Sequence, residues 1–167
     1  MLSELDDCDI KILQILQHDC RITAKEMSDK VGKSVTAVHE RIRRLEDSGY
    51  ILRYVALLDG ARIGRGVTGY TTIHLKEHSQ SVLRAFEREV IKFPEVMECC
   101  QLTGQADFII RVVIADLQAY NEFLLDKLAT LANIGTVQTS FVLSEAKRET
   151  AYHVAPVSEG KKKVKKK

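Results

Sequence analysis

Two closely spaced helix signals between residues 23 and 45 restrict the possible folds more than any other feature of the sequence. Thr23 and Glu26 have the spacing of a capping box at a helix start, and Gly32 is a natural end for that helix. Ser34 offers a cap for the next helix, whose apolar stripe consists of Val35, Val38, Ile42 and Leu45. An apolar repeat over residues 6–17 predicts an earlier helix. Two helices joined by a tight glycine turn, after a first helix, are typical of a helix-turn-helix.

The polar face expected for the third helix suits the major groove of duplex DNA. Its N-terminal half carries small or hydrogen-bonding side chains, and Arg43 and Arg44 follow within two turns. Lys25 and Lys33 flank the turn and are expected to contact phosphates. The expected DNA-contacting residues are Lys25, Lys33, Ser34, Thr36, Ala37, His39, Glu40, Arg43 and Arg44. For Arg41, beside the apolar stripe, an ion pair within the domain and a DNA contact both stay open. An ordinary three-helix core with a basic surface is the alternative for the whole segment.

The charges are distributed in blocks that indicate a polyanionic partner. Residues 1–19 carry a net charge of −4, residues 20–66 carry +4 and residues 67–160 carry −4. The run 161–167 adds six lysines. The tail 153–167 has no periodicity and is expected to be disordered, and its lysines either add phosphate contacts or only increase solubility.

The second half of the sequence alternates between strand and helix patterns. Strands are expected over 67–76, 96–102, 108–114 and 137–143, with helices over 79–92 and after Asp116. This order predicts a ferredoxin-like βαββαβ domain of the α+β class, with two helices on one face of an antiparallel sheet. The apolar run 108–114 is typical of a strand covered on both faces, so we expect a homodimer that covers the second face.

The expected domain organisation has four parts. Residues 1–50 form the helix-turn-helix domain, residues 51–66 a wing and linker strand, residues 67–152 the ferredoxin-like domain, and residues 153–167 the tail. The stretch 50–58 is expected to be extended.

Composition and motifs argue against several other classes of protein. The longest apolar runs are far shorter than the roughly 20 residues that span a bilayer, and acidic residues occupy the start of the chain where a signal peptide is cationic. A cytoplasmic protein is therefore expected. Cys8, Cys20, Cys99 and Cys100 form no CxxC motif and are expected to be buried free thiols. No cofactor, metal site or catalytic set is expected.

Motifs in both halves resemble the Lrp/AsnC (feast/famine) transcription regulators. The N-terminal motifs are Leu5-Asp6-x-x-Asp9, Arg21-Ile22-Thr23, Val31-Gly32-x-Ser34 and Arg41-Ile42-x-Arg44-Leu45-Glu46-x-x-Gly49-x-Ile51. The C-terminal motifs are Thr103-Gly104-x-x-Asp107-Phe108 and Thr139-Ser140-Phe141-Val142, followed by Lys147. The resemblance covers residues 5–152. It departs at Lys33, where the family usually has Leu, and at Val35, where Pro is frequent.

The resemblance implies a sequence-specific transcriptional regulator with a winged helix-turn-helix and a RAM/ACT-like domain. Such a domain dimerises, assembles into octamers or similar rings, and binds an amino acid between dimers. Two symmetry-related recognition helices would read a palindromic operator. The implied effector site consists of Thr103, Gly104, Gln105, Ala106 and Asp107, with Gln138 and Thr139 from a neighbouring subunit.

Within that site, the glycine turn would offer N–H groups to a carboxylate, and Asp107 would bind an α-ammonium. A purely structural hairpin is the alternative for Gly104 and Asp107. A siroheme-decarboxylase-like enzyme and a stand-alone amino-acid sensor are the alternative functions. The histidines of the second half do not cluster, and the basic third helix favours DNA binding.

Overall fold

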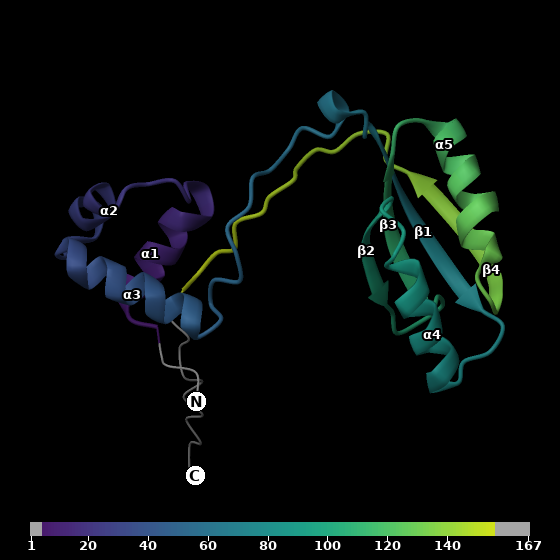
Figure 1. Cartoon of the computed structure of the whole chain (residues 1–167), viewed down its shortest axis with the longest axis horizontal. Coiled ribbons are helices and arrows are strands. Elements are labelled where there is room, and N and C mark those ends of the chain that lie inside the picture. Colours follow the sequence, from purple (N-terminus) through teal and green to yellow (C-terminus); the bar gives the residue numbers. More distant parts are fainter. Residues whose placement is uncertain (1–4, 156–167) are drawn as a thin grey trace, which may run out of the picture. The chain divides into compact units, whose positions relative to one another are not determined.

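The computed structural model describes residues 5–155 and divides them into two compact units (Figure 1). The second unit comprises Leu57–Ala146. The first unit comprises the residues before Leu57 together with those from Lys147 onward, so it is built from two separate segments of the chain. The expected ferredoxin-like domain ran to residue 152, but the contacts group residues 147–155 with the first unit.

Three helices form the first unit, and local capping explains where they begin. They are α1 (Asp7–His18), α2 (Ala24–Val31) and α3 (Val35–Asp47). Thr23 and Glu26 form the predicted capping box, and the Ser34 hydroxyl accepts the N–H of Ala37 at 3.2 Å. Gly32 ends α2 with φ at 66°, a left-handed conformation that glycine adopts without strain. The predicted helix-turn-helix is confirmed.

The core of the first unit is small and comes from one face of each helix. Its buried apolar residues are Ile12, Leu13, Met27, Val38 and Leu45. Val35, which was expected in the same stripe, is 41% exposed. It is the first residue of α3, and the buried stripe begins one turn later at Val38.

The segment after α3 is extended but does not join a sheet. Ile51–Leu58 form no β-strand, and Leu52 is 89% exposed. A short turn of 3-10 helix at Ala61–Ile63 precedes the first strand. Among residues 5–155, the expected wing or linker strand therefore pairs with no other strand. Among the described residues, no helix combines the length and the apolarity that crossing a membrane needs.

The second unit has the predicted ferredoxin-like topology. Its elements are β1 (Val67–Leu75), α4 (Gln80–Val90), β2 (Val96–Gln101), β3 (Phe108–Ile114), α5 (Leu117–Glu122) and β4 (Ile134–Phe141). The antiparallel sheet has the order β2-β3-β1-β4. β4 begins three residues earlier than expected, because a bulge between His74 and Leu75 lets Leu75 pair with Ile134. The helix capped by Asp116 is irregular: α5 continues as a π-turn at Phe123–Lys127.

The two faces of this sheet differ in how they are covered. Phe108, Ile110, Val112 and Ile114 of β3 are fully buried in the core formed with α4 and α5. The alternate residues of β3, such as Ile109, point to the opposite face and are only half-buried. Coverage on both faces was expected, whereas the helices of the described chain cover one. The other face of the sheet carries the strand residues that alternate with the buried core residues, and we call it the open face.

Candidate nucleic-acid interface and ligand site

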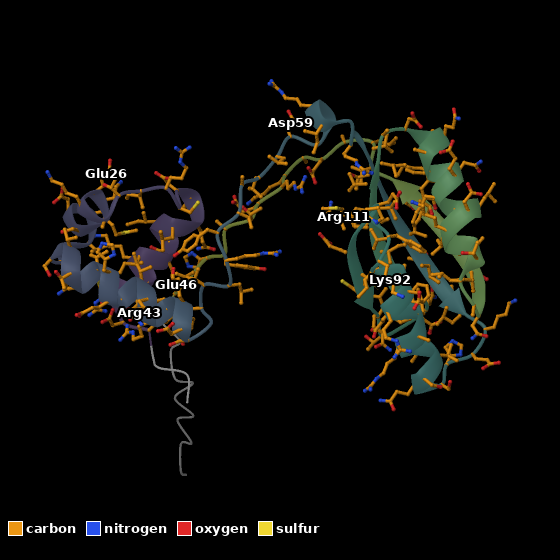
Figure 2. The ribbon with its side chains drawn as sticks, in the orientation of Figure 1. Glu26, Arg43, Glu46, Asp59, Lys92 and Arg111 are labelled. Carbon is orange, nitrogen blue, oxygen red and sulfur yellow. The ribbon has the colours of Figure 1, made fainter. Side chains whose placement is uncertain are left out.

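The outer side of α3 presents most of the residues that the sequence assigned to DNA. Lys33, Ser34, Thr36, His39 and Glu40 are exposed, as is Lys25 on α2, whereas Ala37 is half-buried. The Arg43 side chain is 84% exposed, extends from α3 (Figure 2), and lies 3.8 Å from the Asp47 carboxylate one turn away. These side chains contribute nothing to the core, so they are available to a partner.

Arg44 differs from Arg43 because its guanidinium is bound by α1. Asp9 has a side chain that is only 1% exposed, and it accepts hydrogen bonds from both Arg44 and Arg41. The Arg41 Nη1 is 2.8 Å from Asp9 Oδ1 and 2.6 Å from Asp6 Oδ2. The ion pair considered for Arg41 is therefore present. Asp9 was not expected as the shared partner, because it lies 32 residues before Arg41 and no short-range pattern connects them.

Hydrogen bonds within this cluster favour the charged forms of Asp6 and Arg41. The Asp9 N–H donates to the Asp6 carboxylate at 2.8 Å, and this hydrogen bond, with Arg41 second, lowers the pKa of Asp6 to about 2. Hydrogen bonds to Asp6 and then Asp9 raise the pKa of Arg41 above its ordinary value. The cluster therefore ties the start of α1 to the middle of α3.

The loop between β2 and β3 carries the expected effector residues. Thr103, Gly104 and Gln105 are exposed, and Ala106 is half-buried. Gly104 has φ at 134°, and a Cβ added there would meet open space, so the backbone conformation alone requires glycine.

Asp107 holds this loop to the end of β1. Its Oδ2 accepts the N–H of Leu75 at 2.8 Å, and the His78 Nε2 lies 3.1 Å from the same oxygen. The Asp107 side chain is 18% exposed. The carboxylate therefore has a structural role that does not depend on any ligand. His78 was not expected at this site, since it lies 29 residues earlier in the chain.

Gln138 and Thr139 lie on opposite faces of β4. Thr139 points to the helix side, where its hydroxyl lies 2.9 Å from the Thr71 hydroxyl and also contacts the Tyr120 hydroxyl. Gln138 is exposed on the open face. β1 lies between β4 and β3, the strand that the Thr103–Asp107 loop enters, and no hydrogen bond among the described residues joins Gln138 or Thr139 to this loop.

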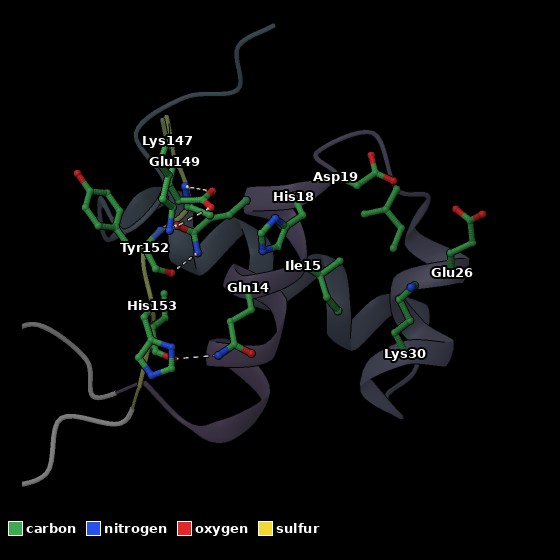
Figure 3. Close-up of a pocket in the computed structure, with 14 residues that line it drawn as sticks. Gln14, Ile15, His18, Asp19, Glu26, Lys30, Lys147, Glu149, Tyr152 and His153 are labelled. Carbon is green, nitrogen blue, oxygen red and sulfur yellow. Dashed lines mark hydrogen bonds and ion pairs between the residues drawn. The ribbon is translucent and has the colours of Figure 1, made fainter. Parts of the chain in front are cut away.

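A groove of about 830 Å³ lies in the first unit between α1, α2 and the segment 147–154 (Figure 3). The Tyr152 N–H donates to Gln17 Oε1 at 2.6 Å, and Gln17 Nε2 donates to the Tyr152 carbonyl at 3.0 Å. Gln14 Nε2 donates to the Val154 carbonyl at 2.9 Å. Val154 also packs against the core of the first unit. The expected disorder from residue 153 is therefore wrong for His153 and Val154, and residues 156–167 lie outside the described residues.

The cysteines make no disulfide, and their burial differs from expectation. Cys8 and Cys99 are half-buried, whereas Cys20 and Cys100 are exposed. Burial raises the pKa of the Cys99 thiol to about 11. Within residues 5–155, no group of three His, Cys, Asp or Glu side chains could hold a metal ion.

Comparison with known proteins matches both units. Residues 68–152 match the family described as the Lrp/AsnC ligand binding domain, and residues 5–51 match winged helix-turn-helix DNA-binding domains. The chain belongs to the Lrp/AsnC family. Its two matched domains make this Lrp/AsnC protein a DNA-binding transcriptional regulator with a ligand-binding domain.

Individual relatives align with this Lrp/AsnC protein over nearly their whole length. The Bkd operon transcriptional regulator of Pseudomonas aeruginosa is 35% identical over 150 residues, which cover 90% of this chain and 98% of the relative. The glutamate uptake regulatory protein of Zymomonas mobilis is 40% identical over 150 residues, covering 90% and 91%. A transcriptional regulator from Neisseria meningitidis, solved as an L-Met complex, superposes with a TM-score of 0.84 at 34% identity, covering 89% and 96%. These relatives are named as regulators rather than as enzymes.

Proposed function

We propose that this regulator reads duplex DNA with the outer side of α3 and is controlled by an amino acid bound at the Thr103–Asp107 loop. The observation that carries the first part is the exposed polar face of α3, which a major groove can accommodate. Residues in its N-terminal half meet base edges, and Lys25 and Lys33 contact phosphates. A cytoplasmic location fits this function.

Substitutions of Arg43 and Arg44 distinguish an effect on DNA binding from an effect on the stability of the domain. Replacement of Arg43 by Ala should weaken binding at least fivefold, because a lost contact to a phosphate or a guanine costs about 1–3 kcal/mol. Its effect on unfolding should stay within about 0.5 kcal/mol, since the side chain is 84% exposed. The measurement is fluorescence anisotropy on a duplex selected from a randomised pool.

Arg44→Ala is the matched variant and should lower the melting temperature, because it removes a partner from Asp9. Equal DNA affinity for Arg43→Ala and the unmodified protein would contradict the assignment.

The effector proposal rests on the chemistry of the loop and on a relative. The positive φ of Gly104 turns the exposed loop backbone, whose N–H groups suit a carboxylate. The carboxylate of Asp107 suits an ammonium group, although its Oδ2 already has two partners. The Neisseria meningitidis regulator was solved with L-Met. We propose an amino acid or a related metabolite as the ligand of this chain, with Gln138 and Thr139 supplied by a neighbouring subunit.

Asp107→Asn tests the ammonium contact without removing the loop anchor. Asn keeps an oxygen that can accept the Leu75 N–H, but it loses the negative charge. A thermal-shift panel of the twenty amino acids identifies the ligand, and calorimetry then measures its affinity. We expect at least a tenfold loss, because hydrogen bonds to charged groups contribute about 1.5–3 kcal/mol. An unchanged affinity in Asp107→Asn would assign this residue to loop structure alone.

The open face of the sheet supports self-association. Tyr70 is 40% exposed there, and Ile109 is half-buried in the single chain. A second copy covering these residues would form a homodimer, and the resemblance implies octamers or similar assemblies. Two α3 helices related by a two-fold axis would then read a palindromic operator. Light scattering with and without the ligand measures the assembly, and a monomer under both conditions would contradict this part of the proposal.

A further inference from the structure

A pocket of about 400 Å³ in the ligand-binding unit lies at the end of the sheet opposite the Thr103–Asp107 loop. Its lining comes from residues just before β1 and β2, from the end of β3, and from α5 with its π-turn. In the register of β1 and β3, Val67 pairs with Ile114 near the pocket, and Ile73 pairs with Phe108 next to the loop. The strands thus separate the two ends by about 20 Å. This pocket is therefore distinct from the proposed effector site.

Glu95, just before β2, lines the pocket with a carboxylate that has a hydrogen-bond partner for only one of its oxygens. Its Oε1 accepts a hydrogen bond from Lys127 Nζ at 2.7 Å, and its side chain is 16% exposed. Its Oε2 is buried, and within residues 5–155 no group donates a hydrogen bond to it. A buried charged oxygen without a donor is costly, so Oε2 is suited to a donor from outside the chain.

The Glu95 carboxylate is ionised at neutral pH. Burial by itself would raise its pKa, but the hydrogen bond from Lys127, together with the charges of Lys127 and Arg65, outweighs burial and holds the pKa below its ordinary value. The unpartnered oxygen is therefore an acceptor that carries negative charge. The donor that it favours is a positively charged one.

The other charges of the pocket also favour a cation. Three acidic and two basic residues line it, namely Glu95, Glu122, Asp126, Arg65 and Lys127. Both basic side chains already have partners, because Lys127 is paired with Glu95 and Arg65 Nη1 donates to the Val113 carbonyl at 3.2 Å. The carboxylates of Glu122 and Asp126 are exposed and add negative charge beside Glu95.

The rest of the lining is mostly apolar. Ile114 and Phe123 belong to the buried core of the unit, and Ala119 packs against that core. Phe123 also begins the π-turn Phe123–Lys127, which carries Lys127 as well, and such helix irregularities are frequent at functional sites. The pocket therefore combines an apolar wall with a negatively charged acceptor.

We propose that this pocket binds a small organic cation, in which an ammonium group on an aliphatic chain donates to Glu95 Oε2. The aliphatic chain lies against Ile114 and Phe123. A second ammonium group suits the exposed carboxylates of Glu122 and Asp126, so an aliphatic diamine is the favoured class of ligand. The inference does not rest on the amino-acid site at the Thr103–Asp107 loop, because no residue is shared between the two.

Calorimetry on the full-length protein tests this proposal with a charged probe and a neutral one of the same length. The charged probe is 1,5-diaminopentane, and the neutral probe is 1,5-pentanediol. We expect the diamine to bind and the diol not to bind, because only the ammonium group supplies a charged donor. Equal binding of the two probes overturns the proposal. Absence of diamine binding at 10 mM overturns it as well, and includes the case in which a water molecule alone satisfies Glu95 Oε2.

Glu95→Gln tests the contact directly, because it removes the negative charge and keeps an oxygen that can accept the Lys127 hydrogen bond. We expect affinity for 1,5-diaminopentane to fall about tenfold or more, since a hydrogen bond to a charged group is lost. Glu89→Gln is the matched control: Glu89 pairs with Lys92 at the same distance of 2.7 Å, but on the exposed side of α4 and outside the pocket. An unchanged affinity in Glu95→Gln, or an equal loss in both variants, overturns the proposal.

Ala115→Leu tests the pocket without changing any charge. Ala115 lines the pocket and is exposed, so a larger side chain there occupies the pocket without entering the core. We expect a loss of diamine affinity of about tenfold or more, with an unchanged melting temperature when no diamine is present. This variant decides the question if Glu95→Gln does not fold. Full affinity in Ala115→Leu would place the diamine elsewhere and overturn the proposal.

Discussion

Replacing Asp9 with Ala is expected to destabilise the DNA-binding unit by about 3 kcal/mol, because a buried carboxylate with two arginine partners is lost. The Asp9 side chain is 1% exposed and binds Arg41 and Arg44. It also accepts the Asp6 N–H at 3.2 Å, which completes the capping box of α1. The loss stays below that of a fully buried pair, because Arg44 is 45% exposed and Arg41 keeps Asp6. Urea unfolding followed by circular dichroism measures the change.

Asp6→Ala is the matched control for this prediction. Asp6 belongs to the same cluster and caps the same helix, but its side chain is 51% exposed. Loss of an exposed cap costs about 1 kcal/mol. Equal destabilisation by the two substitutions would show that burial of Asp9 is not what makes its ion pairs important. A further consequence is that Asp9→Ala should weaken DNA binding, since α3 loses its attachment to α1.

Phe108→Ala is expected to destabilise the ligand-binding unit by about 4 kcal/mol, the cost of a large cavity in a packed core. Phe108 is fully buried, and its ring centroid lies 4.7 Å from that of Phe86 on α4. The substitution removes the contact of the Phe108 ring with Phe86, and the rigid sheet cannot collapse to fill the space. Urea unfolding of the full-length protein, compared with the unmodified chain, measures the loss.

Ile109→Asp changes the next residue of β3 and tests the open face without disturbing the core. Ile109 points away from the helices and is half-buried, so the folded single chain tolerates a change there better than at Phe108. If a second copy covers the open face, a buried carboxylate at this position blocks association. We expect light scattering to report a lower mass for Ile109→Asp, with α4 and α5 still packed. A mass equal to that of the unmodified protein would place the interface elsewhere.

The elements that sequence alone predicted depend on short-range interactions. Thr23 and Glu26 form their capping box within four residues, and Gly32 ends α2 because glycine tolerates a positive φ. β3 covers the predicted residues, Phe108–Ile114, because its β-branched and aromatic side chains favour a strand wherever it is placed. The order of strands and helices was then sufficient for the ferredoxin-like topology.

The proposed interface could be predicted only in part, because some of its side chains depend on contacts between residues far apart in the chain. Helical periodicity places Thr36, His39 and Arg43 on the outer side of α3, and they are exposed. Periodicity places Arg44 next to Arg43 but says nothing of Asp9, which lies 35 residues earlier. Neighbouring arginines therefore looked equivalent in sequence, and only packing of α1 against α3 distinguished them.

The sequence by itself determined the helix caps, the strand pattern and the family to which this protein belongs, because each depends on residues close in the chain or on motifs that keep their spacing. Tertiary structure alone decided which charges are paired, which face of the sheet stays open, and where the segment after β4 lies. The contact between Gln17 and Tyr152 spans 135 residues. Such a contact leaves no periodic signal in sequence, since it forms only after both segments have been positioned by the folds around them.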